Sequence, residues 1–83
     1  MSVAIRIMRN EGVDVPTYVD VDNKDLILAV VNRSEGIVHL YKPVLEIKNE
    51  RKRKKLIDVI VTKAKRKYGI KEVIEHPDST PQN

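Results

Sequence analysis

Residues 49–70 read NERKRKKLIDVIVTKAKRKYGI, and this stretch decides the fold because its apolar residues recur with the period of a helix. On a helical wheel, one stripe about 140° wide holds Leu56, Ile57, Ile60, Val61, Ala64 and Tyr68. Asn49 is a favourable N-cap, and a basic last turn followed by Gly69 is typical of a left-handed C-cap. The stretch therefore predicts an amphipathic helix over Glu50–Tyr68 that packs its apolar stripe on a sheet.

Before this helix, the chain follows the period of two that is typical of strands. Strands are predicted at 3–8, 13–21, 26–31, 37–41 and 44–48. Turns separate the first four strands, and a proline separates the fourth from the fifth. In the second strand, the odd positions from Val13 to Val21 should face the core, and the carboxylates of Asp14 and Asp20 should face water. Pro16 marks the same strand as an edge strand or a bulge.

The predicted fold is one α+β domain, because 83 residues can support a single hydrophobic core. It consists of an antiparallel β-meander of about four strands followed by one long amphipathic helix. The β-branched residues at 70–75 could return as a short C-terminal strand beside the strand that precedes the helix. In this interpretation the domain spans 1–77, and residues 78–83 form a flexible polar tail.

Composition excludes several classes of protein. The sequence has no cysteine, which rules out disulfides, thiol catalysis and zinc sites built on cysteine. The longest apolar run, 26–31, is too short to span a bilayer, and residues 1–12 lack the continuous apolar block of a secretory signal. We therefore expect an intracellular, cytoplasmic protein with no membrane partner. The small core, together with Val59 on the basic side of the predicted helix, predicts a homodimer.

The charge of the chain is strongly polarised. Residues 42–71 hold twelve basic and three acidic side chains, a net charge of +9, whereas the rest of the chain carries −5. Such polarisation can steer an anionic partner toward one surface. The alternative is that the acidic part pairs with the basic part, within one molecule or across a dimer.

Most basic residues of the predicted helix lie opposite its apolar stripe, where they match a phosphate backbone. The predicted nucleic-acid contacts are Lys48, Arg51, Lys52, Lys54, Lys55, Lys63, Lys65 and Arg66. Cations in the first turns interact unfavourably with the helix dipole, and each costs about 0.3–1 kcal/mol of stability. A bound polyphosphate would offset this cost. The chain has three tyrosines but neither Phe nor Trp, so a multi-aromatic platform for single strands is excluded. We therefore predict non-catalytic binding of nucleic acid, with duplex favoured.

The same cationic surface could instead bind an acidic protein, in which case the chain would be an inhibitor or a scaffold. A solvated face without a partner is a further alternative. No glycine-rich phosphate loop is present, and His39 and His76 have no second ligand at metal-binding spacing, so no cofactor is predicted for the binding module.

A catalytic alternative comes from Glu46-Ile47-Lys48, because period two places Glu46 and Lys48 on one face of the last predicted strand. With a further acid from a neighbouring strand, such as Asp25, these residues could hold Mg²⁺ beside a phosphodiester. In this order of elements, 25–74 resembles the core of the restriction-endonuclease-like nuclease superfamily. The resemblance implies a minimal metal-dependent nuclease in which Asp25 and Glu46 are metal ligands and Lys48 positions water or stabilises charge. The simpler interpretation is a structural ion pair, since acid-x-Lys occurs twice more in the chain.

Overall fold

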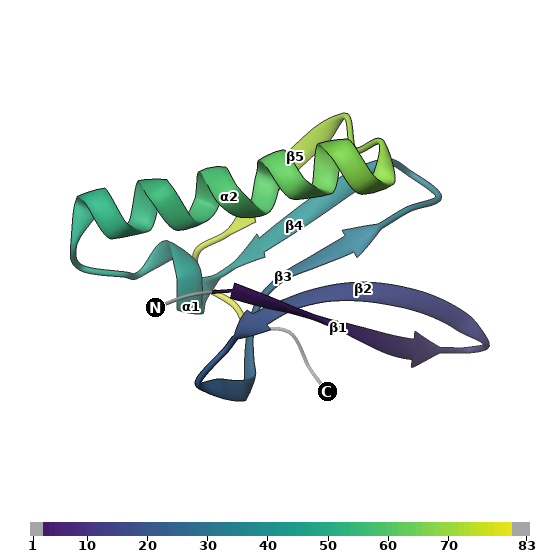
Figure 1. Ribbon diagram of the computed structural model, residues 1–83, viewed down its shortest axis with the longest axis horizontal. Coiled ribbons are helices and arrows are strands. Elements are labelled where there is room, and N and C mark those ends of the chain that lie inside the picture. The colour runs from purple at the N-terminus through teal and green to yellow at the C-terminus, as the bar shows by residue number, and fades with distance from the viewer. Residues whose placement is uncertain (1–2, 81–83) are drawn as a thin grey trace.

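The computed structural model describes residues 3–80 and has the α+β fold that the sequence predicts. Five strands form one sheet in the order β1-β2-β3-β4-β5, and the first four are an antiparallel meander. The strands are β1 Val3–Asn10, β2 Val13–Asp20, β3 Asn23–Asn32, β4 Ile37–Tyr41 and β5 Glu72–His76, and the helices are α1 Lys42–Leu45 and α2 Glu50–Tyr68. Figure 1 shows α2 alongside β4 and β5, while the β1–β2 hairpin extends away from it.

The long helix has the ends that its sequence predicts. The side-chain oxygen of Asn49 accepts a hydrogen bond from the backbone N–H of Lys52 at 3.1 Å, which satisfies one of the free donors of the first turn. At the other end Gly69 adopts a φ of 65°, and its N–H donates to the carbonyl of Lys65 at 3.1 Å. This left-handed residue ends the helix and lets the chain turn back toward the sheet.

The predicted C-terminal strand is confirmed as β5. It pairs in parallel with β4, from Ile37 opposite Glu72 to Tyr41 opposite His76. The connection runs through α2, because neighbouring parallel strands need a long crossover. The carbonyl of Gly36 accepts hydrogen bonds from the N–H groups of residues 71 and 72 at 2.8 and 3.1 Å, which joins the turn before β4 to the start of β5.

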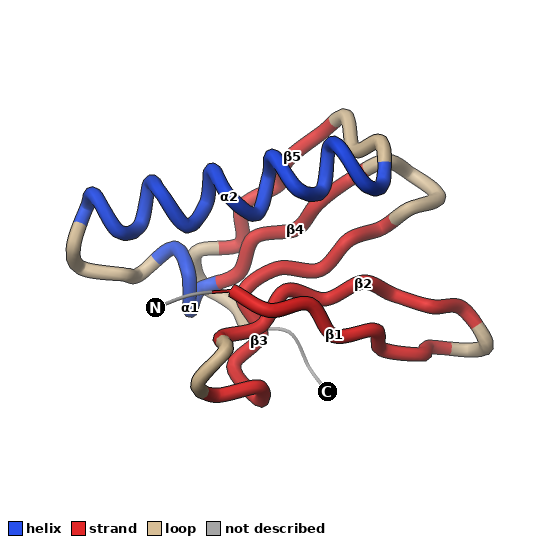
Figure 2. Tube along the Cα trace, viewed as in Figure 1, coloured by secondary structure: helices blue, strands red, loops and turns tan. Residues whose placement is uncertain are grey.

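The core lies between α2 and one face of the sheet. The helix buries Leu56, Ile60 and Ala64, three residues of its predicted apolar stripe. The buried side chains of the sheet in the same cluster include Ala29, Val31, Val38 and Leu40. Figure 2 shows the helix on one side of the strands. This packing leaves the opposite side of α2 in solvent.

A β-bulge in β3 places two consecutive residues in the core. Tyr18 pairs with Ala29 and Val19 pairs with Ile27, so Leu28 has no partner in β2. An extra residue shifts the alternation of side chains along the strand. Leu28 and Ala29 therefore both belong to the cluster packed under α2, which explains why this segment reads as a continuous apolar run.

The predicted orientation of β2 is partly wrong. Tyr18 and Asp20, at even positions, are 2% and 8% exposed, whereas Val13 and Val21 are 62% and 42% exposed. Tyr18 faces the core because it pairs with Ala29, which lies under α2. The buried carboxylate of Asp20 accepts a hydrogen bond from the backbone N–H of Asp22 at 3.0 Å, which compensates part of its lost hydration.

Pro16 does not mark an edge, because β2 lies between β1 and β3. The ladder with β3 covers only 17–20 of β2, so Pro16 lies just outside it. A residue without an N–H is tolerated at such a position. The edges of the sheet are β1 and β5.

The strand predicted at 44–48 is also wrong. Residues Lys42–Leu45 form the short helix α1, with Pro43 in its first turn, where the fixed φ of proline suits a helix. The N–H of Glu46 closes this turn by donating to the carbonyl of Lys42 at 2.9 Å. Val44 is fully buried, so its apolar side chain serves the core from a helical turn.

Residues 81–83 of the predicted tail lie outside the described part of the chain. Closer to the domain, the carbonyl of Ser79 accepts a hydrogen bond from the N–H of Lys42 at 3.0 Å, so this part of the tail contacts the start of α1. Neither helix seen in residues 3–80 has the length and apolar character needed to cross a membrane.

Candidate nucleic-acid interface

Eight basic side chains of α2 lie in solvent, and seven of them form one set that excludes Lys67. This set, which we call the cationic face, consists of Arg51, Lys52, Lys54, Lys55, Lys63, Lys65 and Arg66, all exposed. Its position follows from the core, because burial of Leu56, Ile60 and Ala64 turns the other side of the helix outward. Lys48 is exposed in the loop between α1 and α2, two residues before the helix begins.

Few of these charges are neutralised by neighbouring acids. The three ion pairs found within residues 3–80 are Arg9–Asp14 at 3.1 Å, Lys42–Glu46 at 3.8 Å and Glu50–Lys54 at 3.0 Å. Over that part of the chain, no acid of the meander forms an ion pair with α2. The acidic part of the molecule therefore does not pair with the cationic face there, and the positive potential is available to a partner.

Arg53 differs from the other cations of the first turns. It is half-buried, and its guanidinium donates a hydrogen bond to the carbonyl of Ile47 at 2.9 Å. This contact ties the start of α2 to the preceding loop. Arg53 is therefore a structural residue.

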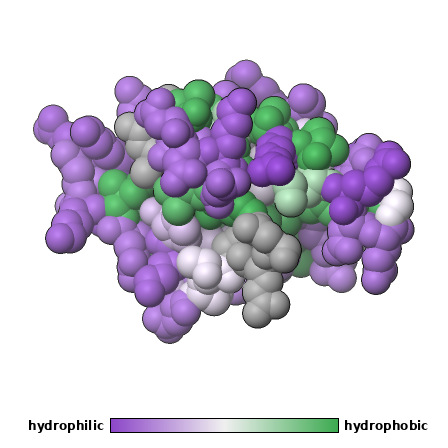
Figure 3. Space-filling view, turned by 90° about the horizontal axis from the view of Figure 1, so that it is seen from below, coloured by the Kyte–Doolittle hydropathy of each residue, from purple (hydrophilic) through white to green (hydrophobic). Residues whose placement is uncertain are grey.

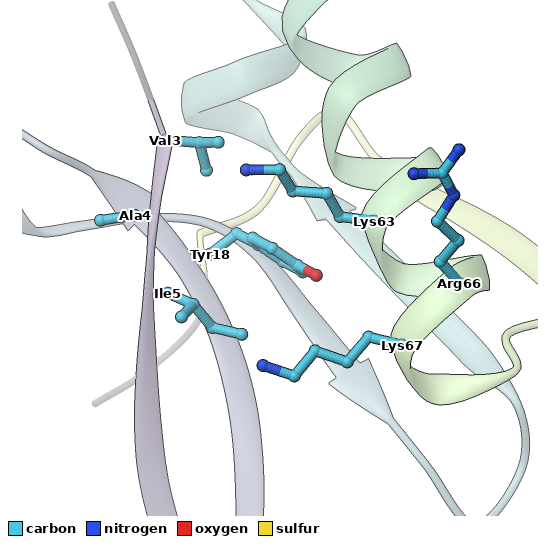
Figure 4. A pocket seen from close by; sticks show the side chains of 7 residues that line it. All are labelled: Val3, Ala4, Ile5, Tyr18, Lys63, Arg66 and Lys67. Atoms are coloured by element: carbon cyan, nitrogen blue, oxygen red, sulfur yellow. The ribbon is translucent and has the colours of Figure 1, made fainter.

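A groove of about 320 Å³ lies between β1 and α2 (Figure 4). Its lining is Val3, Ala4 and Ile5 from β1, Tyr18 from β2, and Lys63, Arg66 and Lys67 from α2. Lys63 and Lys67 extend toward β1 on either side of the Tyr18 ring, whereas Arg66 points away from the ring (Figure 4). The groove exists because α2 packs mainly on buried side chains of β3 and β4 and leaves β1 uncovered (Figure 1).

Tyr18 brings an isolated hydroxyl to this groove. Burial, and secondly the neighbouring Tyr68 phenol, raise the pKa of Tyr18, so the hydroxyl stays protonated at neutral pH. No hydrogen bond from it is found to any residue in 3–80, and no fully buried side-chain oxygen is left unpaired there. The hydroxyl therefore keeps contact with the groove and can donate to a ligand.

Of the seven lining residues, the predicted contacts include only Lys63 and Arg66, and the two polar ones that sequence reasoning missed are Tyr18 and Lys67. Tyr18 was missed because the strand pattern assigned the odd positions of β2 to the core. Lys67 belongs to the basic last turn of α2, which was a visible signal, but its side chain reaches toward β1 and not into the cationic face. Only the packing of α2 beside β1 brings both residues together.

The residues of the nuclease alternative do not form the arrangement that the resemblance implies. Asp25 is exposed near the start of β3. Glu46 follows α1 and pairs with Lys42, not with Lys48, so neither a metal pair nor the expected structural ion pair is seen. Within the described residues, no three metal-ligating side chains are grouped to hold an ion. The Glu-x-Lys motif also lacks the strand on which that assignment depends.

Two histidines meet on the face of the sheet opposite α2, although they are far apart in sequence. His39 Nδ1 and His76 Nε2 are 2.9 Å apart, and the Tyr41 ring stacks on His76 with centroids 4.9 Å apart. Burial, and secondly the positive charge that His76 can carry, lower the pKa of His39, while Glu35 opposes this effect. The contact arises from the parallel pairing of β4 with β5, and two donors alone do not make a metal site.

Comparison with known proteins leaves the interpretation to geometry and charge. No protein-family model matches the chain, and no significant match was found among curated proteins or among solved structures.

Proposed function

We propose that this protein binds nucleic acid without catalysis, and that the cationic face of α2 contacts the phosphates of a duplex. The observation that carries the proposal is a row of exposed cations on one rigid helix, of which Lys54 alone pairs with an acid of the described chain. Lys48 extends the row beyond the helix N-terminus. Backbone contacts of this kind give affinity without sequence preference.

The dimensions of the helix suit a duplex. From Arg51 to Arg66 the helix axis runs for about 22 Å at ~1.5 Å per residue, which is roughly two-thirds of a DNA turn of ~34 Å. Duplex DNA presents about one phosphate charge per 1.7 Å of its axis, so several phosphates lie within reach. The major groove, about 12 Å wide, also admits a helix.

The start of α2 offers a second reason for an anionic partner. Arg51 and Lys52 lie in the first turn, where the helix dipole is positive and cations are unfavourable. A phosphate bound there would interact favourably with both cations and with the free N–H groups of the turn. The arrangement is costly for the isolated protein and favourable for a complex.

The test is a gel shift with labelled duplex and labelled single strands over a salt series, with and without Mg²⁺. We expect retarded duplex whose amount falls steeply as salt rises, because cation–phosphate contacts release counterions. Salt-independent binding, or no binding at low salt, would overturn the proposal. Cleavage that appears only with Mg²⁺ would show that the protein is a nuclease, and the non-catalytic assignment would then be wrong.

We also propose that two copies associate, in the cytoplasm. The edge strand β1 carries Ile7, which is 53% exposed, and Val13 at the hairpin end is 62% exposed. Viewed from below, apolar side chains are visible among hydrophilic ones (Figure 3), and exposed apolar surface favours association. Val59 is half-buried on α2. Light scattering should give twice the mass of one chain, and Ile7→Lys should return it to that of a monomer.

A further inference from the structure

The groove between β1 and α2 combines two kinds of surface that one ligand must match. One side is apolar and accessible, since Ile5 is 42% exposed and lies beside Val3. The other side carries the ammonium groups of Lys63 and Lys67. Neither ammonium forms an ion pair with an acid in residues 3–80. A ligand that covers this groove therefore needs an anionic part beside the two lysines and an apolar part beside β1.

The Tyr18 hydroxyl lies between these two sides and defines where the anionic part binds. Tyr18 is 2% exposed and its ring belongs to the core, so the hydroxyl has a fixed position. It points toward α2, with one lysine on each side (Figure 4). A fixed O–H donor flanked by two ammonium groups suits an oxyanion that accepts several hydrogen bonds, as phosphate does.

We infer that this groove binds one unpaired nucleotide of a nucleic-acid strand, with its phosphate on Tyr18, Lys63 and Lys67 and its base against Val3 and Ile5. The inference rests on the proposed function and deepens it. In a duplex, neighbouring bases cover the faces of each base, and only an unstacked nucleotide can place an apolar face on β1. The volume of about 320 Å³ is at the lower end for small-molecule sites, which suits one nucleotide.

The groove also continues the cationic face, which argues for the same strand over an unrelated anion. Lys63 and Arg66 belong to both surfaces, and Arg66 points from the groove toward the outside. A strand whose duplex part follows α2 can therefore leave one nucleotide of an unpaired end in the groove without losing its phosphate contacts. The preferred substrate is a duplex with a single-stranded overhang.

The experiment compares three fluorescein-labelled DNAs by anisotropy: a blunt 12-base-pair duplex, the same duplex with a three-nucleotide overhang, and a single-stranded 12-mer. Tyr18→Phe removes only the donor and keeps the ring in the core. Lys67→Gln changes an exposed side chain that lies outside the cationic face. Tyr41→Phe is the matched control, because it removes a phenol from the opposite face of the sheet.

We expect wild-type protein to bind the overhang duplex more tightly than the blunt one. Tyr18→Phe and Lys67→Gln should each weaken binding of the overhang duplex about ten-fold, the effect of losing a hydrogen bond or contact to a charged group. Both variants should bind the blunt duplex like wild type, and Tyr41→Phe should match wild type on every DNA.

The outcomes separate this inference from the proposed function. If wild type binds both duplexes equally and Tyr18→Phe behaves like Tyr41→Phe, the groove does not bind a nucleotide, while the duplex-binding function stands. If no DNA is bound at low salt, the proposed function itself fails, and the inference fails with it. If a glutamate-rich peptide displaces the overhang from wild type but not from Tyr18→Phe at equal occupancy, the groove is a peptide site, and the nucleotide assignment is wrong.

Discussion

The cationic face can be tested by removing four of its charges without touching the groove. The four residues, which we call the outer cations, are Arg51, Lys52, Lys55 and Lys65. All four are exposed and lie outside the groove, and none forms an ion pair with an acid of residues 3–80. Replacement of each by Gln keeps a long side chain with good helix propensity. The variant therefore changes charge and little else.

The expected magnitude follows from the number of contacts removed. Each phosphate contact adds about 0.9 to the slope of log affinity against log salt concentration on duplex DNA. Loss of four contacts should therefore reduce the steepness of that slope by up to about 3.6. Between about 50 and 200 mM salt, the affinity of the wild type should fall roughly 150-fold more than that of the variant. Anisotropy titrations of a blunt duplex at five salt concentrations measure both slopes.

Unfolding of the variant should not explain its lost affinity. Arg51 and Lys52 oppose the helix dipole, so their removal is expected to stabilise α2 by about 0.3–1 kcal/mol each. The loss of Lys65 from the last turn acts in the opposite direction by a similar amount. The midpoint of urea unfolding should therefore equal or exceed that of the wild type.

The control removes the same charge from elsewhere. It replaces four exposed cations outside α2 by Gln, namely Arg6, Arg9, Lys24 and Lys71. Both variants have a net charge four units lower than the wild type, so a general effect of charge would flatten the two slopes equally. Equal slopes in the two variants, or an outer-cation variant with the slope of the wild type, would refute the assignment of the cationic face.

Three further predictions concern the scaffold. Ile60 is fully buried between α2 and the sheet, so Ile60→Ala should lower the free energy of unfolding in urea by about 3–4 kcal/mol, whereas Val59→Ala should lower it by less than ~1.5 kcal/mol. A loss below ~1 kcal/mol for Ile60→Ala would contradict the packing of α2. At Gly69, φ is 65° and no atom lies within 4 Å of an added Cβ. Gly69→Ala should therefore lower the free energy of unfolding only by the backbone strain of about 1–2 kcal/mol. An unchanged thermal midpoint would argue against the left-handed cap. Because burial and then His76 lower the pKa of His39 below 6.5, folding should keep His39 neutral, and the free energy of unfolding should fall as pH drops from 6.5 through the folded pKa. His39→Phe should flatten this part of the pH profile, and an identical profile in the variant would exclude the histidine contact as its cause.

Local chemistry explains which elements the sequence could predict. The ends of α2 depend on Asn49 and Gly69, whose capping bonds join residues within a few positions of each other. The turn between β1 and β2 depends likewise on its two residues, Glu11 and Gly12, which adopt the positive φ angles of 53° and 79° that a tight hairpin needs. The residues of the cationic face follow from the helical period alone.

Sequence period could not decide what depends on neighbours in space. The alternation at 44–48 fits a strand as well as a turn of helix, and the chain forms α1 there, which places Val44 in the core. The alternation in β2 does not decide which of its two faces is buried. Pairing with the bulged strand β3 determines that Tyr18 turns toward α2. Period two specifies that neighbours in a strand face opposite ways, but not which way is inward.

By itself, therefore, the sequence determined that this chain is a meander followed by one cationic helix, because strand alternation and helix capping are interactions over a few residues. Only the tertiary structure decided that α2 packs mainly on β3 and β4 and leaves β1 uncovered. The groove is the consequence, since it joins residues from β1, β2 and α2 that lie up to 64 positions apart, as Val3 and Lys67 do. Their proximity depends on the packing of a whole layer, which no local pattern encodes.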